Sequence, residues 1–207
     1  MFTGIVEDLG QVVSRRGGRL VVRSPVAASD AAVGDSISIG GVCLTVVGTD
    51  GDELSFDISE ETFERTSLGA LRPDGSVNVE RPATLASRLG GHLVQGHVDG
   101  VAEVEAVRPG GDGVRLSVRL PGDLLHLVVE KGSITLDGVS LTVAAIDRDV
   151  IEVALIPHTL RVTTLGSARE GDLLNVEIDV VAKYVARNLE HLMTDGATVE
   201  PGKERTA

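Results

Sequence analysis

Apolar and polar residues alternate in short runs along most of the chain, and glycine or aspartate separates one run from the next. A period of two is typical of strands that bury one face, so these runs predict β-strands. The clearest runs are residues 20–24, 36–39, 54–58, 115–120 and 133–136. Residues 49–52 and 147–149 are turn formers between strands. Many short strands with such turns indicate an antiparallel sandwich or a small barrel, and closure into a barrel leaves no exposed edge.

The periodicity changes near the C-terminus. Apolar residues recur there at three- and four-residue spacing, which predicts one amphipathic helix over residues 180–194 with Asp179 as its N-cap. The polar tail at 195–207 is expected to be disordered. Two shorter helices are predicted at 60–67 and 159–165, each ended by a Leu-Gly pair that resembles a C-cap.

The chain contains the same pattern twice. The matching segments are Gly4-Ile5-Val6-Glu7 with Gly96-His97-Val98-Asp99, Gly41-Val42-Cys43-Leu44-Thr45-Val46 with Gly138-Val139-Ser140-Leu141-Thr142-Val143, and Asn78-Val79-Glu80 with Asn175-Val176-Glu177. A period this long exceeds that of solenoid repeats, so each copy is expected to be a closed domain with its own core. We therefore predict an all-β protein with domains at 1–95 and 96–179, and the helix follows them.

Composition and charge exclude several classes of function. The net charge is −12 without a basic run, which argues against binding to nucleic acid or to an anionic membrane. The only cysteine, Cys43, excludes an internal disulfide framework and fits a reducing compartment. The first ten residues lack a basic start and a long apolar core, so we expect no signal peptide, and no apolar run approaches the length of a membrane span.

Two equivalent strands carry small polar residues on one face. Alternate residues of a strand share a face, so Cys43 lies with Thr45, and Ser140 lies with Thr142. Such a face suits a flat polar heterocycle. Ordinary strand threonines and a small buried cysteine are the alternative, but recurrence in both copies favours a ligand site in each copy.

The glycine-led segments at Gly4 and Gly96 are the second signal, because a strand that opens with glycine lets a ligand ring approach the backbone. His97 takes the place that Ile5 has in the first copy. An imidazole at this position would suit proton transfer, with a structural histidine as the alternative.

Other constellations predict less. His92 and His97 are five residues apart on an extended chain and would face opposite ways, so a metal site is not expected. Nothing marks a base beside Cys43, which makes it a poor nucleophile. Lys131, between Glu130 and Gly132, fits a solvated turn, although a position facing a ligand stays open.

These motifs together resemble the riboflavin synthase family. The resemblance covers residues 1 to about 190 and is carried by Met1–Glu7, Gly41–Val46, Gly90–Asp99, Lys131–Ser133, Asp137–Val143, Thr163–Gly166 and Asn175–Asp179. One departure is Gly40, where the family often has Asn or Asp, as the second copy has at Asp137. It affects an expected polar contact in the first site.

The resemblance implies two six-stranded antiparallel Greek-key barrels, each binding one lumazine, and a C-terminal helix that helps to form a homotrimer. It implies a transferase in which two molecules of 6,7-dimethyl-8-ribityllumazine dismutate by four-carbon transfer to riboflavin and 5-amino-6-(ribitylamino)uracil. The productive site would lie between barrels of neighbouring subunits. No metal or cofactor is implied. A cytoplasmic location and an association with lumazine synthase are also expected.

The resemblance also implies the site residues. Those expected to take part in catalysis are Cys43, Thr45, His97, Ser140, Thr142 and Asp179. Those expected to contact substrate are Gly4, Ile5, Val6, Cys43, Leu44, Thr45, Asp57, Ile58, Ser59, Glu60, Glu61, Thr62, Gly96, His97, Val98, Lys131, Ser140, Leu141, Thr142, Ile156, Pro157, His158, Thr159, Leu160 and Arg161. Two alternatives remain: a lumazine- or flavin-binding antenna protein of the same superfamily, and a purely structural duplicated barrel.

Overall fold

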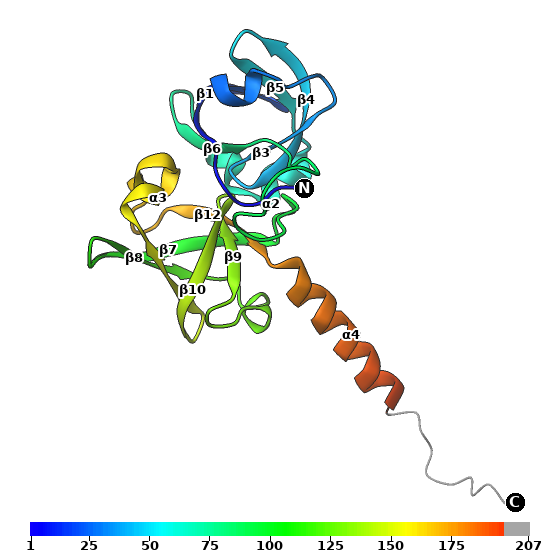
Figure 1. Ribbon diagram of the computed structural model, residues 1–207, viewed down its shortest axis with the longest axis vertical. Coiled ribbons are helices and arrows are strands. Elements are labelled where there is room, and N and C mark those ends of the chain that lie inside the picture. Colours follow the sequence, from blue (N-terminus) through cyan, green and yellow to red (C-terminus); the bar gives the residue numbers. More distant parts are fainter. Residues whose placement is uncertain (197–207) are drawn as a thin grey trace, which may run out of the picture.

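Twelve strands pair into two closed rings within residues 1–196, the part of the chain that the computed structural model describes (Figure 1). Each ring has six antiparallel strands, and around each ring they follow the order first, second, fifth, fourth, third, sixth. This is a Greek-key order, because the third, fourth and fifth strands are successive neighbours and the second strand lies beside the fifth. The prediction of two six-stranded antiparallel barrels is therefore confirmed.

The repeat is visible in the bounds of the elements. The first barrel consists of β1 (Asp8–Arg16), β2 (Arg19–Arg23), β3 (Ser36–Ile39), β4 (Val42–Asp50), β5 (Glu53–Asp57) and β6 (Ser76–Glu80). The second consists of β7 (Gly100–Gly110), β8 (Gly113–Arg119), β9 (Ser133–Leu136), β10 (Val139–Asp147), β11 (Val150–Leu155) and β12 (Leu173–Ile178). The helical elements are α1 (Pro25–Ala28), α2 (Glu60–Arg65), η1 (Ser67–Ala70), η2 (Leu125–Leu127), α3 (Pro157–Val162), η3 (Thr164–Ser167) and α4 (Val180–Gly196).

Each barrel has its own core of branched aliphatic side chains, as the alternation predicts. In β4 the inward residues Val42, Leu44 and Val46 are buried, and the residues between them face outward. Side chains of this size contribute about 1.5–3 kcal/mol each when they are buried. The inward face of each strand therefore closes the barrel, and the outward face is free for other contacts.

The two barrels meet along a seam with reciprocal contacts. The side chain of Asn78 donates to the Asp137 carbonyl at 2.8 Å and accepts from the Thr164 amide at 2.8 Å. Asn175 does the same in the other direction, toward the Gly40 carbonyl and the Ser67 amide at 2.8 and 2.6 Å. Contacts that repeat with the partners exchanged are those of a two-fold arrangement.

Glycine is required where the barrels touch most closely. A Cβ on Gly41 would lie 2.6 Å from the amide nitrogen of Gly138, and one on Gly138 would lie 2.9 Å from that of Gly41. Position 40 also faces this seam, since a Cβ there would lie 3.7 Å from Nδ2 of Asn175 in the second barrel. Position 40 is therefore a seam position, and its effect on a polar contact in the first site stays a prediction.

The short helices differ from the prediction at their ends. α2 and α3 end before Thr66 and Thr163, which have extended backbone, and each Leu-Gly pair lies in the 3₁₀ turn that follows. The Leu-Gly pairs are therefore not C-caps. The hydroxyls of Thr66 and Thr163 donate to the carbonyls of Thr62 and Thr159, which ties each turn to its helix.

The C-terminal helix α4 extends away from the second barrel (Figure 1). Asp179 accepts a hydrogen bond from the Val181 amide at 3.0 Å, which confirms the predicted N-cap. The helix continues to Gly196, two residues past the predicted end, and the remainder of the tail that was expected to be disordered lies outside the described residues. No helix within residues 1–196 is long and apolar enough to cross a membrane.

Candidate active site

The polar faces predicted on β4 and β10 lie on the outside of the barrels. Cys43 is partly buried and Thr45 is exposed, and Ser140 and Thr142 have the same environments in the second barrel. Each face also carries a hydroxyl from the neighbouring strand, since Cys43 lies directly opposite Ser38 and Ser140 directly opposite Thr135 in the sheet. Each barrel therefore presents one small, hydrogen-bonding surface.

The glycine-led segments are exchanged between the barrels. Gly96, from the second copy, packs on β4 of the first barrel, where its carbonyl accepts the Cys43 amide at 2.9 Å. A Cβ on Gly96 would lie 2.6 Å from that of Cys43, so glycine permits this approach. Val98 then packs against the first core. The segment with His97 thus borders the Cys43 and Thr45 face.

The first copy makes the reciprocal contact. The carbonyl of Gly4 accepts the Ser140 amide at 2.7 Å, and Val6 packs against the second core. A Cβ on Gly4 would lie 2.6 Å from the Cβ of Ser140. Each polar strand therefore receives the glycine-led segment of the other copy.

The predicted contact residues at the end of β5 and in α2 follow the first polar face. Thr45 and Asp57 project from neighbouring strands, because Val46 lies opposite Phe56 and both of these face the core. Ser59 caps α2 by accepting the Thr62 amide at 3.1 Å. The exposed residues here are Asp57, Ser59, Glu60 and Glu61, whereas Ile58 is buried in the core.

The corresponding residues of the second barrel lie in and before α3. Ile156, Pro157, His158 and Arg161 are exposed, and Thr159 is partly buried. Leu160 packs against the second core instead. These residues precede η3, whose first amide is held by Asn78 across the seam. Both α2 and α3 therefore connect a polar face to the seam.

Three other predicted residues have defined positions. The side chains of Leu44 and Leu141 are part of the cores or pack against them, so only their backbone is available for a ligand. Lys131 is an exposed turn residue at φ 65°, and its ammonium donates to the Ala144 carbonyl of β10 at 2.8 Å. Lys131 is therefore tied to the strand that carries Ser140 and Thr142.

A residue that sequence reasoning passed over gives the second site its clearest chemistry. His92 is buried, and its Nδ1 lies 2.7 Å from Ser140 Oγ, with Nε2 3.2 Å from Thr135 Oγ1. Burial lowers the pKa of His92, and the charge of Asp179 opposes that effect. A neutral imidazole between two hydroxyls accepts a hydrogen bond from one of them and donates a hydrogen bond to the other. His97, by contrast, follows Gly96 at the first barrel.

The signal for His92 was in the residues before it. A Cβ on Gly91 would lie 2.7 Å from Ser140 Oγ, so the double glycine lets the chain pass beside the serine before His92 reaches it. Two buried carboxylates were also passed over, Glu80 and Glu177. Their signal was the repeated Asn-Val-Glu motif.

Comparison with known proteins gives this arrangement a class. The lumazine binding domain family matches residues 3–82 and again residues 95–179. Two crystal structures of LumP are similar: the complex with riboflavin (TM-score 0.80, 28% identity, 86% of this chain and 99% of that chain) and the complex with 6,7-dimethyl-8-(1'-D-ribityl) lumazine (TM-score 0.78, 27% identity, 86% and 98%). The fold and the paired sites are those of a protein with two lumazine-binding domains.

Curated relatives narrow the class to one enzyme family. The riboflavin synthase of Mycobacterium tuberculosis is 50% identical over 195 residues, which cover 90% of this chain and 97% of that protein. The riboflavin synthase of Bacillus subtilis is 37% identical over 193 residues, with 91% and 90% covered. This chain belongs to the riboflavin synthase family.

Proposed function

We propose that this protein dismutates 6,7-dimethyl-8-ribityllumazine. One molecule transfers a four-carbon unit to a second molecule, which gives riboflavin and 5-amino-6-(ribitylamino)uracil. The observation that carries the proposal is that both copies keep a glycine segment against a small polar face, Gly96 at Cys43 and Gly4 at Ser140. A reaction between two copies of one ligand needs two such sites.

The chemistry needs placement more than a strong base. The C7 methyl of a lumazine is acidic, because its anion delocalises into the fused ring. Holding two rings face to face in a reactive orientation is worth about 7–11 kcal/mol of the barrier. Hydrogen-bond donors at the pyrimidine edge stabilise charge as it develops. Hydroxyls, backbone amides and the ammonium of Lys131 supply such donors around the two faces.

Two imidazoles are available for proton transfer, one for each barrel. In the second barrel we propose that Ser140 contacts the ligand and that His92 holds the serine proton, because the two side chains lie 2.7 Å apart. In the first barrel His97 is exposed beside the face of Cys43 and Thr45. Asp179 acts on His92 through its charge.

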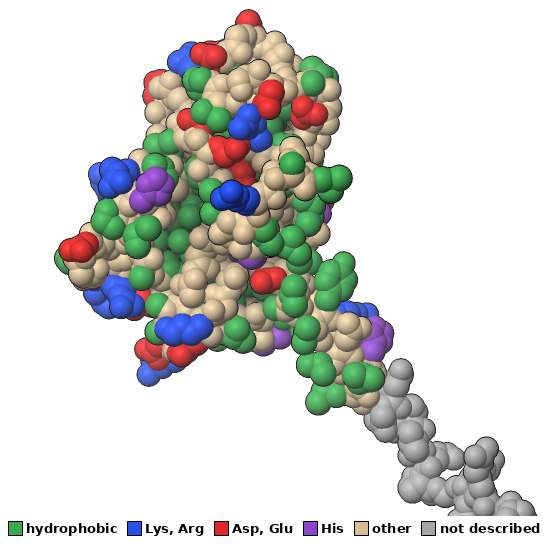
Figure 2. Space-filling view, viewed as in Figure 1, with side chains coloured by type: hydrophobic (Ala, Val, Ile, Leu, Met, Phe, Trp, Pro, Cys, Tyr) green, Lys and Arg blue, Asp and Glu red, His purple; other side chains and the backbone are tan. Residues whose placement is uncertain are grey.

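We also propose that the protein is a homotrimer whose reactive site combines barrels of neighbouring subunits. The support is α4, whose apolar side chains are exposed in the single chain (Figure 2). Val181, Tyr184 and Leu189 are 56, 67 and 54% exposed. Covering such side chains contributes about 1.5–3 kcal/mol each. Sedimentation of the purified protein tests this part.

A cytoplasmic location and an association with lumazine synthase belong to the same proposal. The free Cys43 supports a reducing compartment. The association rests on the family resemblance, and co-sedimentation of the two purified proteins tests it.

The alternative is a protein that binds the lumazine without converting it. The similarity of the fold to that of LumP supports this alternative. Identity of 50% to a riboflavin synthase favours the enzyme. Incubation of the protein with the lumazine separates the two. Growth of riboflavin absorbance supports the proposal, and bound but unchanged lumazine would support the alternative.

A further inference from the structure

The Asn-Val-Glu motif at the end of each barrel is not used by the proposed chemistry, although it recurs in both copies. It forms the end of β6 in the first copy, where Val79 faces the core. Alternation turns Asn78 and Glu80 the other way, toward the second barrel. The motif in β12 is arranged in the same manner. Asn and Glu therefore both face the seam.

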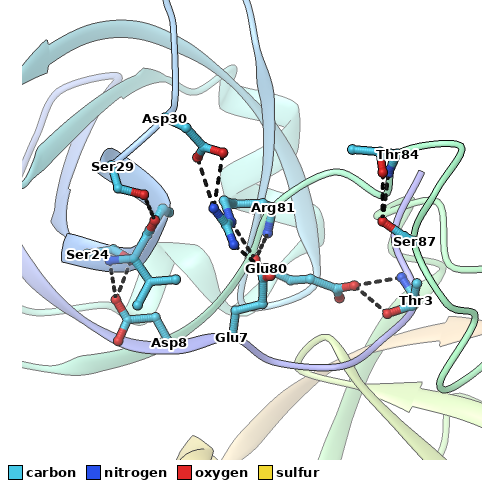
Figure 3. Close-up of polar contacts among 12 residues, drawn as sticks. Thr3, Glu7, Asp8, Ser24, Ser29, Asp30, Glu80, Arg81, Thr84 and Ser87 are labelled. Atoms are coloured by element: carbon cyan, nitrogen blue, oxygen red, sulfur yellow. Dashed lines mark hydrogen bonds and ion pairs between the residues drawn. The ribbon is translucent and has the colours of Figure 1, made fainter.

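The buried carboxylate of Glu80 holds the segment that contains Gly4. Its Oε1 accepts the Thr3 amide at 2.6 Å and the Thr3 hydroxyl at 2.8 Å (Figure 3). Its Oε2 accepts the Gly4 amide at 3.0 Å. The opposite side of the same segment binds Ser140 of the second barrel through the Gly4 carbonyl. A carboxylate of the first barrel thus supports a wall of the second site.

Glu177 makes the reciprocal arrangement. It accepts the amides of Gln95, Gly96 and His97 at 2.7, 2.8 and 3.0 Å. The carbonyl of Gly96 then accepts the amide of Cys43 in the first barrel. Burial raises the pKa of both glutamates, and the hydrogen bonds from the backbone amides oppose this rise. The hydrogen bonds from the amides therefore offset the cost of burying each carboxylate.

We propose that Glu80 and Glu177 are positioning residues that act crosswise: Glu80 orders the ligand site of the second barrel, and Glu177 orders that of the first. The inference rests on the proposed function only for the identity of the ligand. A carboxylate offers two acceptor oxygens, so it can hold successive amides of a bend at once. Glutamine keeps the shape but turns one acceptor into a donor that faces another donor. Glu80→Gln and Glu177→Gln therefore release one segment each.

Hydrogen exchange of the full-length protein without ligand provides the first test. In Glu80→Gln we expect faster exchange in peptides that contain Ser140, and in Glu177→Gln in peptides that contain Cys43. The expected change is about tenfold, as for the loss of one charge-assisted hydrogen bond. Val77→Ala is the matched control, because it weakens the core of the first barrel without touching either segment. It should accelerate exchange in the first barrel only.

The second test adds riboflavin as the probe and measures protection of the same peptides. Glu80→Gln should lose protection around β10 and keep it around β4, and Glu177→Gln should show the reverse. Effects confined to the barrel that carries the mutation, or equal in both barrels, would overturn the proposal. If riboflavin protects neither barrel of the wild type, the proposed function fails, and the ligand-free exchange still decides the crosswise action.

Discussion

The pair of Ser140 and His92 makes a quantitative prediction for the variant His92→Phe, which keeps a ring but removes both hydrogen bonds. Thr135 is 1% exposed, so water cannot replace its lost partner, and a buried unpaired hydroxyl costs about 1–3 kcal/mol. The partly exposed Ser140 loses one further bond. We expect the free energy of unfolding to fall by about 2–4 kcal/mol, measured by urea denaturation.

Turnover should fall for a different reason, because Ser140 loses its proton acceptor. Acid–base assistance is commonly worth about 10²–10⁴-fold in rate, so we expect at least a hundredfold slower single turnover of lumazine. Affinity for riboflavin should change much less, since the glycine wall and the rest of the polar face remain. Stopped-flow absorbance and a fluorescence titration measure the two quantities separately.

The double variant His92→Phe/Thr135→Val separates catalysis from stability. Replacing both partners of a buried hydrogen bond by apolar groups is nearly neutral, so most of the lost unfolding free energy should return. Turnover should stay low, because Ser140 still has no imidazole. Recovery of turnover together with stability would refute the reasoning and leave His92 with a structural role.

Three further predictions follow from the same contacts. Burial raises the pKa of Asp137 from 3.8 to about 7, so its contribution to stability is present below pH 3.8 and is lost as the pH rises through 7. Asp137→Asn should remove roughly 1–2 kcal/mol of that pH dependence, less than the full shift because the residue as a whole is only partly buried. Identical pH profiles of unfolding for the two proteins would contradict this prediction. A chain that ends after Lys183 keeps the Lys183–Asp99 ion pair at 2.6 Å but loses most of α4. We expect it to form monomers that bind lumazine and barely convert it. A monomer by sedimentation that is fully active in the product assay would disprove the shared site. His97→Ala should slow single turnover about a hundredfold with unfolding free energy unchanged, because the imidazole is exposed; an unaltered rate would exclude a role in proton transfer.

Much of the fold was predictable because the alternation is local and repeated. Runs such as 36–39 and 133–136 have one apolar face each, which is enough to place a strand and its core side. The repeat then required two barrels of the same design. The Leu-Gly pairs misled because glycine after leucine fits a helix end and a 3₁₀ turn equally well.

The site was only partly predictable, because its decisive contacts join distant parts of the chain. The repeat shows that the segments at Gly4 and Gly96 are alike, but it does not show on which barrel each one packs. His92 reaches Ser140 across 48 positions, and the double glycine before it indicates a close approach without indicating which residue is approached. Glu80 looks like a solvated strand residue until its three donors are seen.

The exchange of the two glycine segments also bears on how the chain is connected. Each barrel packs a segment of the other copy on its surface, and the contacts of Asn78 and Asn175 are reciprocal. The two barrels are therefore related like the protomers of a domain-swapped dimer. The stretch from 81 to 90 then acts as a tether that keeps the partners at high effective concentration. With the ligand sites proposed above, neither half contains a whole site of its own. Cutting the tether should leave a complex held by the seam, whereas removing either half should take away part of both sites.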